Sequence, residues 1–294
     1  IGRYGMGLPN SSVSQARRVE VFTWRDAGPC WYSYLDVTEI AEGRLESIPL
    51  PKRRALPTAY QGQESRSGTL VIWSQCDRLD FKKITTLAEH LRRPLGRMFR
   101  HFLYSGRCLW VNGVPIKPVD PLMLNNHGHD HAEVFGEPLV YPVKLRGRHG
   151  GEIISKIEVR FSLLPIRKWH CLTDTEKRAL GISNNAGVSI IRGLREVDYG
   201  WFFMGSKRRE NYDDWWRCEV RFQPALDNLF GVTHTKQQIR PTPALHEILT
   251  KDMEATARRL NGLVRKVHEG LGTTKARMSE DRQLMERDGR LPAL

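Results

Sequence analysis

A glycine-rich segment at the start of the chain has the composition of an anion-binding turn. Gly2, Gly5 and Gly7 lie close together, and the polar residues that follow at 10–14 predict the start of a helix. Glycines let the backbone turn sharply and approach an anion closely, while unpaired N–H groups at a helix start point toward such a ligand. The segment therefore suits a polyphosphate. A purely structural turn before a helix remains the alternative.

Two common nucleotide-binding motifs are disfavoured at this segment. A Walker loop requires a Lys-Ser or Lys-Thr pair after the glycines, and no such pair follows here. A Rossmann fingerprint requires a strand before the glycines, and the sequence given contains none there.

The next residues predict the back half of an α/β layer. Residues 18–24 alternate apolar and polar positions, residues 31–37 do so less regularly, and residues 68–73 form the continuous apolar run of a central strand. Residues 41–67 are polar and contain prolines, so we predict a loop there.

A helical region and a hairpin then open a second domain. Apolar positions recur at helical spacing over residues 81–104 and are interrupted by Pro94, which predicts one kinked helix or two short ones. Residues 108–116 predict a hairpin because Asn112 and Gly113 form a strong turn signal.

The rest of the chain predicts a mixed α+β domain that ends in a long helix. Residues 120–150 read as loop-rich, and Thr173 and Glu176 predict a capped helix at 173–180. We predict strands at 155–164, 188–191 and 219–222. The long helix follows Pro243, and its apolar stripe consists of Leu245, Ile248, Leu249, Leu260, Leu263, Val264 and Val267. The tail from Gly270 is polar, so we expect it to fray.

The first eight residues, with the helix and strand after them, resemble the second glycine box of the GHKL ATPases, the superfamily of gyrase, heat-shock-ninety chaperones, histidine kinases and MutL. In that superfamily the box ends the ATP lid and wraps the triphosphate. The resemblance implies that ATP is contacted by Gly2, Arg3, Tyr4, Gly5, Met6, Gly7 and Leu8. Gly68-Thr69 is similar to a later Gly-Thr whose threonine helps to fix the adenine. The alternative for Thr69 is an ordinary β-branched residue that starts a strand.

A second match lies far along the chain. Thr235-Lys236-Gln237 resembles a loop of the transducer domain, from which a basic residue of clamp-forming GHKL enzymes reaches the γ-phosphate. The resemblance makes Lys236 the phosphate sensor, with Gln237 or Thr235 assisting. A compact ammonium on a flexible stem suits this role, because it can pair with the phosphate only when two domains close. An ordinary surface lysine is the alternative.

The resemblance is closest in style to MutL, MORC and heat-shock-ninety proteins and implies an α+β architecture. It consists of the C-terminal part of a Bergerat-type α/β sandwich, a transducer-like α+β domain and a C-terminal helix. The expected parts are the ATP-binding domain at 1–78, connecting helices at 79–106, the transducer at 107–242, the helix at 243–270 and a polar tail at 271–294.

The resemblance also implies ATP and Mg²⁺ as cofactors. The glutamate that activates water and the asparagine that binds magnesium lie before this box in the superfamily, so neither can be assigned here. We expect ATP hydrolysis by the full-length protein and not by this fragment alone, because phosphoryl transfer to water needs both groups.

Composition leaves a different class of function open. The net charge of +13 and pI ≈ 9.8 favour encounters with polyanions, so a basic nucleic-acid-binding module without nucleotide chemistry is the alternative. The basic clusters, which solvated faces would also explain, lie at 52–54, 92–93, 144–148 and 207–209. DNA and, through ATP-driven closure, a second copy of the protein are the expected partners. No apolar run approaches the roughly 20 residues of a membrane span, so we expect a cytoplasmic protein.

Three other features carry weaker hypotheses. His127, His129 and His131, with Asp130, could hold zinc, but no distal ligand matches them. The five cysteines show no Cys-x-x-Cys spacing. Trp215 and Trp216 are expected in the core, with partner binding as the alternative. Lys207-Arg208-Arg209 is expected to be a solvated turn and is the first place to test for DNA contact.

Overall fold

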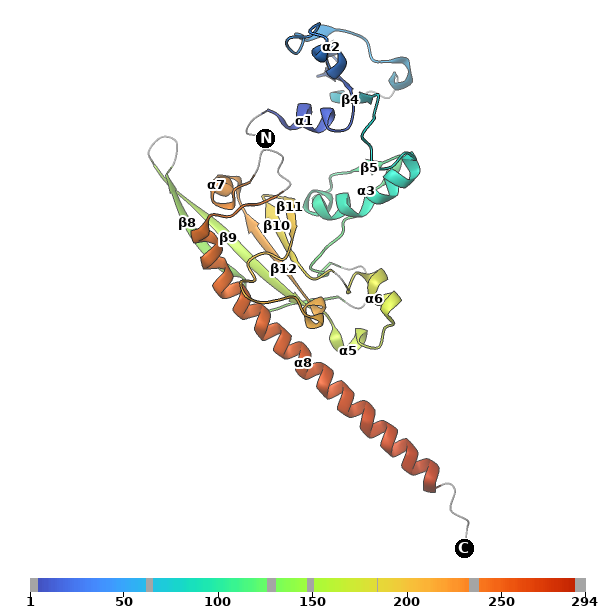
Figure 1. Cartoon of the computed structure of the whole chain (residues 1–294), viewed down its shortest axis with the longest axis vertical. Helices are drawn as coiled ribbons and strands as arrows, with labels where there is room; N and C mark the ends of the chain where they lie inside the picture. Colours follow the sequence, from blue (N-terminus) through green and yellow to red (C-terminus); the bar gives the residue numbers. More distant parts are fainter. Residues whose placement is uncertain are drawn as a thin grey trace. The chain divides into compact units, whose positions relative to one another are not determined.

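The computed structural model describes residues 5–61, 66–125, 131–146, 151–183, 185–232 and 238–288, with side chains described as far as residue 271. The chain divides into two compact units, Ile1–Glu89 and His90–Leu294 (Figure 1). Each unit contains its own β-sheet with helices, which confirms the predicted α+β class.

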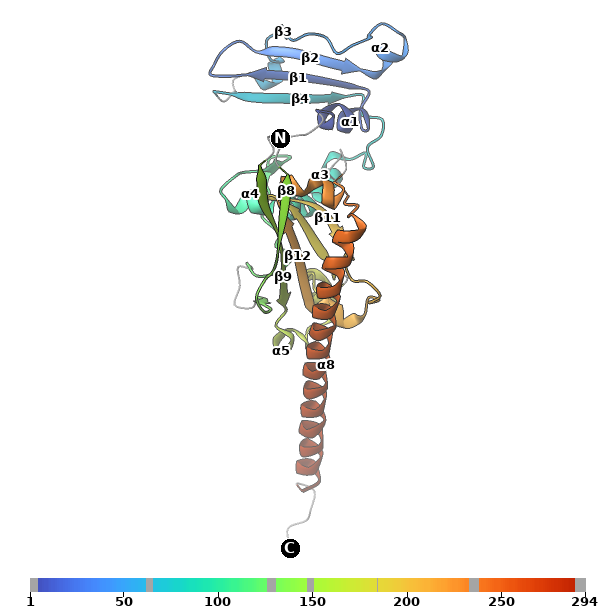
Figure 2. The ribbon, with the colours of Figure 1, turned by 90° about the vertical axis from the view of Figure 1, so that its left-hand side faces the viewer.

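The first unit contains a four-stranded antiparallel sheet in the order β3-β2-β1-β4 (Figure 2). The strands are β1 Arg18–Trp24, β2 Trp31–Asp36, β3 Lys52–Arg53 and β4 Gly68–Ser74. We expected residues 68–73 to form a central strand, but β4 lies at an end of this sheet. Its burial alternates between half-buried and exposed positions, so the apolar run reflects two different faces and does not fix a central place.

One face of this sheet is covered by the polar segment that we predicted as a loop. Phe22, Tyr32 and Leu56 form the buried cluster there, and Leu56 comes from that segment. The Phe22 and Tyr32 rings are 4.8 Å apart between centroids. The same segment also contains β3 and the short 3-10 helix Thr58–Tyr60. Helix α2, Val37–Ala41, begins at Asp36, whose side chain accepts two backbone N–H bonds.

The second unit contains a six-stranded sheet in the order β11-β10-β12-β9-β7, with β8 also paired to β9. The strands are β7 Glu133–Val134, β8 Leu139–Arg146, β9 Glu152–Leu163, β10 Val188–Arg192, β11 Arg195–Gly200 and β12 Trp216–Phe222. Only β10 and β12 are parallel within the described sheet. Strand β8 lies in a stretch that we predicted to be loop-rich. The strand contains Pro142. Proline is tolerated there because β8 pairs on one side alone, so its other side needs no N–H donor.

The hairpin prediction is confirmed. Strands β5, Trp110–Val111, and β6, Val114–Pro115, pair with each other across Asn112 and Gly113. Both turn residues have left-handed φ angles, 50° and 75°, as a tight hairpin turn requires.

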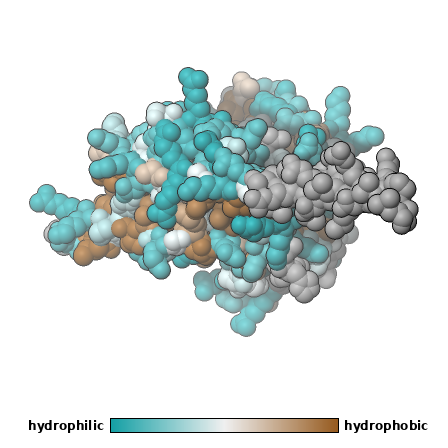
Figure 3. All heavy atoms as spheres, turned by 90° about the horizontal axis from the view of Figure 1, so that it is seen from below, coloured by the Kyte–Doolittle hydropathy of each residue, from teal (hydrophilic) through white to brown (hydrophobic). Residues whose placement is uncertain are grey.

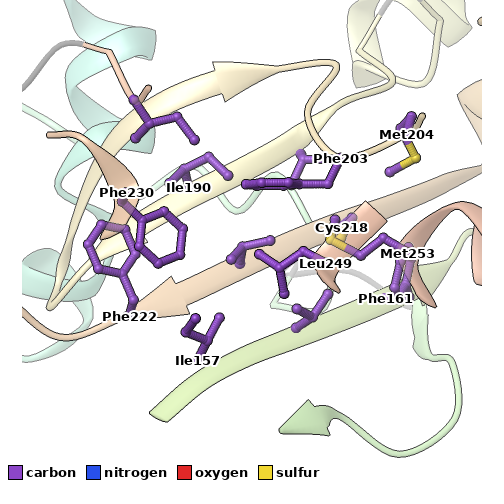
Figure 4. Close-up of a cluster of buried hydrophobic side chains, with 14 of the residues drawn as sticks. Ile157, Phe161, Ile190, Phe203, Met204, Cys218, Phe222, Phe230, Leu249 and Met253 are labelled. Carbon is purple, nitrogen blue, oxygen red and sulfur yellow. The ribbon is translucent and has the colours of Figure 1, made fainter. Parts of the chain in front are cut away.

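A long helix covers the apolar face of this sheet. Helix α8 runs over Pro243–Asp288, past residue 270, where we expected it to end. Leu249, Met253, Ala257 and Leu260 on this helix are fully buried against the sheet. Figure 4 shows Leu249 and Met253 beside Phe161 and Cys218. Two residues of the predicted stripe lie outside it, because Ile248 and Leu263 are exposed.

The opposite face of the same sheet holds a buried ionic network. Arg100 donates to Glu196 at 3.0 Å, to Glu219 at 2.6 Å and to Ser189 at 2.8 Å, and all four side chains are buried. Burial alone would raise the pKa of Glu219, but the hydrogen bond from His101 and the charges of its arginine neighbours lower that pKa to about 2. The network therefore attaches the start of one helix to three strands.

That helix is α4, Arg100–Tyr104, which follows α3, Ile84–Met98. We predicted one kinked helix or two short ones, and two are present. The break falls at Phe99, while Pro94 lies inside α3.

Short helices complete the second unit: α5 Ile166–Trp169, α6 Asp174–Leu180, α7 Asp227–Phe230 and the 3-10 helices Asn211–Trp215 and Pro224–Leu226. The predicted capping box of α6 is confirmed, since Thr173 and Glu176 exchange side-chain to backbone hydrogen bonds. Trp215 and Trp216 are buried, as predicted.

Candidate functional site

The glycine segment leads directly into the first helix. Helix α1 is Gly7–Val13, so Gly7 and Leu8 belong to its first turn, whereas we expected a start at residue 10. Gly5 has a left-handed φ of +66°, a conformation that glycine adopts at little cost. The predicted site residues Gly2, Arg3 and Tyr4 lie outside the described residues.

Helix α1 is attached by polar contacts to strand β4 and to the segment that follows it. Trp73 Nε1 donates to Ser12 Oγ at 2.9 Å, and Arg78 Nη1 donates to the carbonyl of Val13 at 2.6 Å. Ser12 is fully buried. Strand alternation could have placed Trp73 on the same face as Thr69, because positions 69, 71 and 73 of a strand share a face.

Thr69 lies on this face of β4. Its Oγ1 is 3.0 Å from Oγ1 of Thr23, its partner on β1, and both side chains are exposed. Glycine at the preceding position, 68, is explained by packing. A Cβ there would lie 2.6 Å from the Trp24 ring, so only glycine fits against that ring.

Between Thr69 and the helix, the sheet face is apolar and partly open. Val71 and Trp73 on β4 are each 39% exposed, and Trp31 on β2, level with Thr69, is 41% exposed. The strand registers place these side chains on the same face, because Thr23 pairs with both Thr69 and Trp31. Trp73 lies four positions after Thr69, roughly 13 Å along an extended strand. The first unit thus presents hydroxyl groups at one end of an apolar strip and helix α1 at the other.

The proposed sensor Lys236 lies outside the described residues, as do Thr235 and Gln237. The residues on both sides of this segment are described. Arg240 N donates to Phe230 O at 2.9 Å, and Arg192 forms two bonds of 2.6 and 2.7 Å with Asp227 of α7. The residues that flank this segment are therefore held together at the end of β10 in the second unit.

The basic clusters divide into structural and exposed parts. Lys207 is buried, lies 2.6 Å from Asp213 and stands 5.1 Å from the Trp201 ring. The expectation of a solvated turn is therefore wrong for Lys207, because an acid and an aromatic ring enclose its ammonium. Arg208 and Arg209 are exposed. Hydrophilic side chains dominate the face seen in Figure 3, and apolar ones lie between them in patches.

The proposed zinc ligands cannot be assembled from the described part of the chain. His127, His129 and Asp130 lie outside it, and His131 alone is described. Within the described ranges no three His, Cys, Asp or Glu side chains are grouped as a metal site would need. Nor does any helix there combine the length and apolar character of a membrane crossing.

Scans against protein families and curated proteins give no match. Among solved structures, the chain is similar to the B subunit of DNA gyrase from Myxococcus xanthus, with 10% identity, a TM-score of 0.34 and coverage of 84% of this chain and 68% of that one. It is also similar to the topoisomerase IV ATP-binding domain of Francisella tularensis, with 10% identity, a TM-score of 0.34 and coverage of 92% and 74%. Likenesses this distant assign no family to the chain.

Proposed function

We propose that the intact protein is an ATP-binding conformational switch of the GHKL type. The glycine segment would contact the triphosphate, Thr69 would help to fix the adenine, and Lys236 would read the γ-phosphate. The observation that carries the proposal is the placement of Thr69 on the same sheet face as helix α1, with a partly open apolar strip between them.

The switch would work through differential binding. If Lys236 pairs with the γ-phosphate only in a closed arrangement, ATP stabilises that arrangement and ADP does not. Magnesium would neutralise phosphate charge, with its protein ligands supplied by residues before the glycine box. Closure would change the surface offered to DNA or to a second copy of the protein.

The sensor role is tested by nucleotide discrimination. In the full-length protein, Lys236→Ala should lower the affinity for ATP by about tenfold relative to that for ADP, because one charge-assisted contact is lost. Titration calorimetry with each nucleotide measures both affinities. Lys251→Ala, which removes an exposed lysine of α8, is the matched control. Equal weakening of ATP and ADP would exclude the sensor role.

The adenine role is tested separately. Thr69→Val keeps the shape of the side chain but removes its hydroxyl. The affinities for ATP and for ADP should therefore both fall by about three- to tenfold. Thr58→Val removes another exposed hydroxyl of the first unit and should leave both affinities unchanged. Unchanged binding by Thr69→Val would exclude Thr69 from the site.

A basic nucleic-acid module is the second candidate. Its support is the net charge of +13 and the exposed side chains of Lys52, Arg53 and Arg54. DNA binding with a steep salt dependence that ATP leaves unchanged in the full-length protein would favour it over the switch.

A further inference from the structure

A large cavity lies within the second unit, on the side of the sheet that carries α4. Its volume is about 850 Å³, within the range of roughly 300–1,000 Å³ that is typical of small-molecule sites. The walls come from the end of α3, the segment 117–125, the end of α6 and strands β11 and β12. Every lining residue belongs to the same unit.

The charges that line this cavity are strongly unbalanced. Arg93, Arg97, Lys117 and Arg217 contribute four cations, and Asp120 is the single acid among the lining residues. The Asp120 carboxylate is already engaged, because it accepts the backbone N–H groups of Leu122, Leu124 and Asn125. The cavity therefore has an excess of positive charge.

Arg217 contributes a buried cation without an ionic partner. Its side chain is only 2% exposed, and its guanidinium donates to the carbonyl oxygens of Asp214, Trp216, Gly181 and Ile182. No carboxylate in the described ranges forms an ion pair with it. Carbonyl oxygens accept from its N–H groups without supplying a full negative charge, and Asp214 acts on it only at a distance, so an anion placed in the cavity would be attracted.

Two more cations are available at the surface of the cavity. Arg93 and Lys117 are exposed, and neither forms an ion pair within the described part of the chain. Arg97 is less available, since it bonds Glu196 at 2.7 Å and lies 4.3 Å from the Tyr199 ring centre. Gly181 allows Arg93 to come close, because a Cβ there would lie 2.7 Å from the Arg93 guanidinium.

Much of the remaining wall is apolar, although Asn125, Asn185 and Tyr199 also line the cavity. Pro94, Tyr104, Pro118, Met123 and Leu180 line it, and Tyr104 and Leu180 are 41% and 47% exposed. Exposed apolar side chains beside unpaired cations suit a ligand that has both an apolar body and an anionic group.

We propose that this cavity binds a small organic anion, whose flat apolar body lies against Tyr104 and Leu180 and whose phosphate or carboxylate pairs with Arg93 and Lys117 in the field of Arg217. None of the residues that line this cavity is among those proposed to contact ATP. Substitution at Thr69 should therefore leave it unaffected.

The test uses 1-naphthyl phosphate, which combines an aromatic body with a phosphate. We expect saturable binding to the full chain by titration calorimetry, and weaker binding of both inorganic phosphate and 1-naphthol. The double variant Arg93→Gln/Lys117→Gln should lower the affinity for naphthyl phosphate by about tenfold or more. 1-Naphthaleneacetate, which carries a carboxylate on the same ring system, distinguishes carboxylate from phosphate preference in the same titration, and binding of either supports the site.

The matched control is Arg167→Gln/Arg208→Gln, which removes two exposed arginines of the same unit outside the cavity. It should lower the affinity for naphthyl phosphate by less than about twofold. It removes the same net charge as the test variant but changes no residue of the cavity. Equal weakening by both double variants would overturn the proposal in favour of general electrostatic attraction. Absence of saturable binding, or binding no tighter than that of inorganic phosphate, would also overturn it. Circular dichroism confirms that each variant remains folded.

Discussion

The sheets of the two units differ in how completely their faces are covered. In the second unit α8 buries the apolar face, and the opposite face holds the Arg100 network. In the first unit one face is covered by the segment that carries Leu56, while on the other Val71, Trp73 and Trp31 remain about two-fifths exposed. The second sheet therefore buries its apolar surface where α8 covers it, although Val140, Ile153 and Ile154 at its β8–β9 end are more than half exposed. The first sheet retains an apolar face, beside helix α1, of the kind that binds other groups.

The largest expected effect concerns the covered sheet. Arg100→Ala removes the cation between Glu196 and Glu219 and leaves two buried carboxylates facing each other. The free energy of unfolding of the second unit should fall by about 3–5 kcal/mol, as measured by urea denaturation. Arg97→Ala is the control, since Arg97 pairs with the same Glu196 but is 34% exposed, and its loss should be about 1 kcal/mol or less.

The acid sensitivity of this network follows from the depressed pKa of Glu219. A carboxyl whose pKa falls from 4.5 to about 2 on folding stabilises the folded state above pH 4.5. That contribution, up to about 3 kcal/mol, is lost as the pH falls from 4.5 to 2. Urea denaturation of the native chain should therefore show a steeper loss in this window than Glu219→Gln, and identical pH profiles would contradict the assignment.

The apolar face of the covered sheet provides a matched pair of positions on α8. Leu249 is fully buried and Ile248 is 54% exposed. Leu249→Ala should lower the free energy of unfolding by about 2–4 kcal/mol, because it leaves a cavity against the sheet. Ile248→Ala should change it by about 0.5 kcal/mol or less. Similar losses in thermal unfolding would mean that α8 is oriented differently.

The smallest expected effect concerns the open sheet. Trp73→Phe keeps an aromatic ring but removes the N–H that donates to Ser12, so the contact between α1 and β4 should weaken by about 1 kcal/mol. Amide exchange should then accelerate over α1. Trp31→Phe, at a similarly exposed position on the same face, should leave α1 unchanged. Equal effects would show that the Trp73 hydrogen bond does not hold the helix.

Local patterns predicted the elements better than their places in the fold. Alternation located β1 and β2, the Asn112-Gly113 pair located a hairpin, and Thr173 with Glu176 located α6, because each signal acts within a few residues. Whether a strand lies at the edge of a sheet depends on pairing with distant residues. The continuous apolar run of β4 therefore indicated a strand but gave the wrong place for it.

Burial of charged groups was the least predictable feature. Lys207 belongs to an Arg/Lys run that suggests a solvated surface, yet Asp213 and Trp201 enclose it. Arg100 and Arg217 carry no local signal, since their partners lie on other elements. Of the candidate site, Thr69 and the residues from Gly5 to Leu8 belong to the first unit, and the contribution of Lys236 stays a prediction.

Hydrogen–deuterium exchange of the full-length protein, with and without Mg-ATP, tests the nucleotide-binding face most directly. We predict slower amide exchange over residues 5–13 and 68–74 when ATP is present, and no such protection with inorganic phosphate alone. Unchanged exchange in both segments at a saturating ATP concentration would contradict ATP binding at this face.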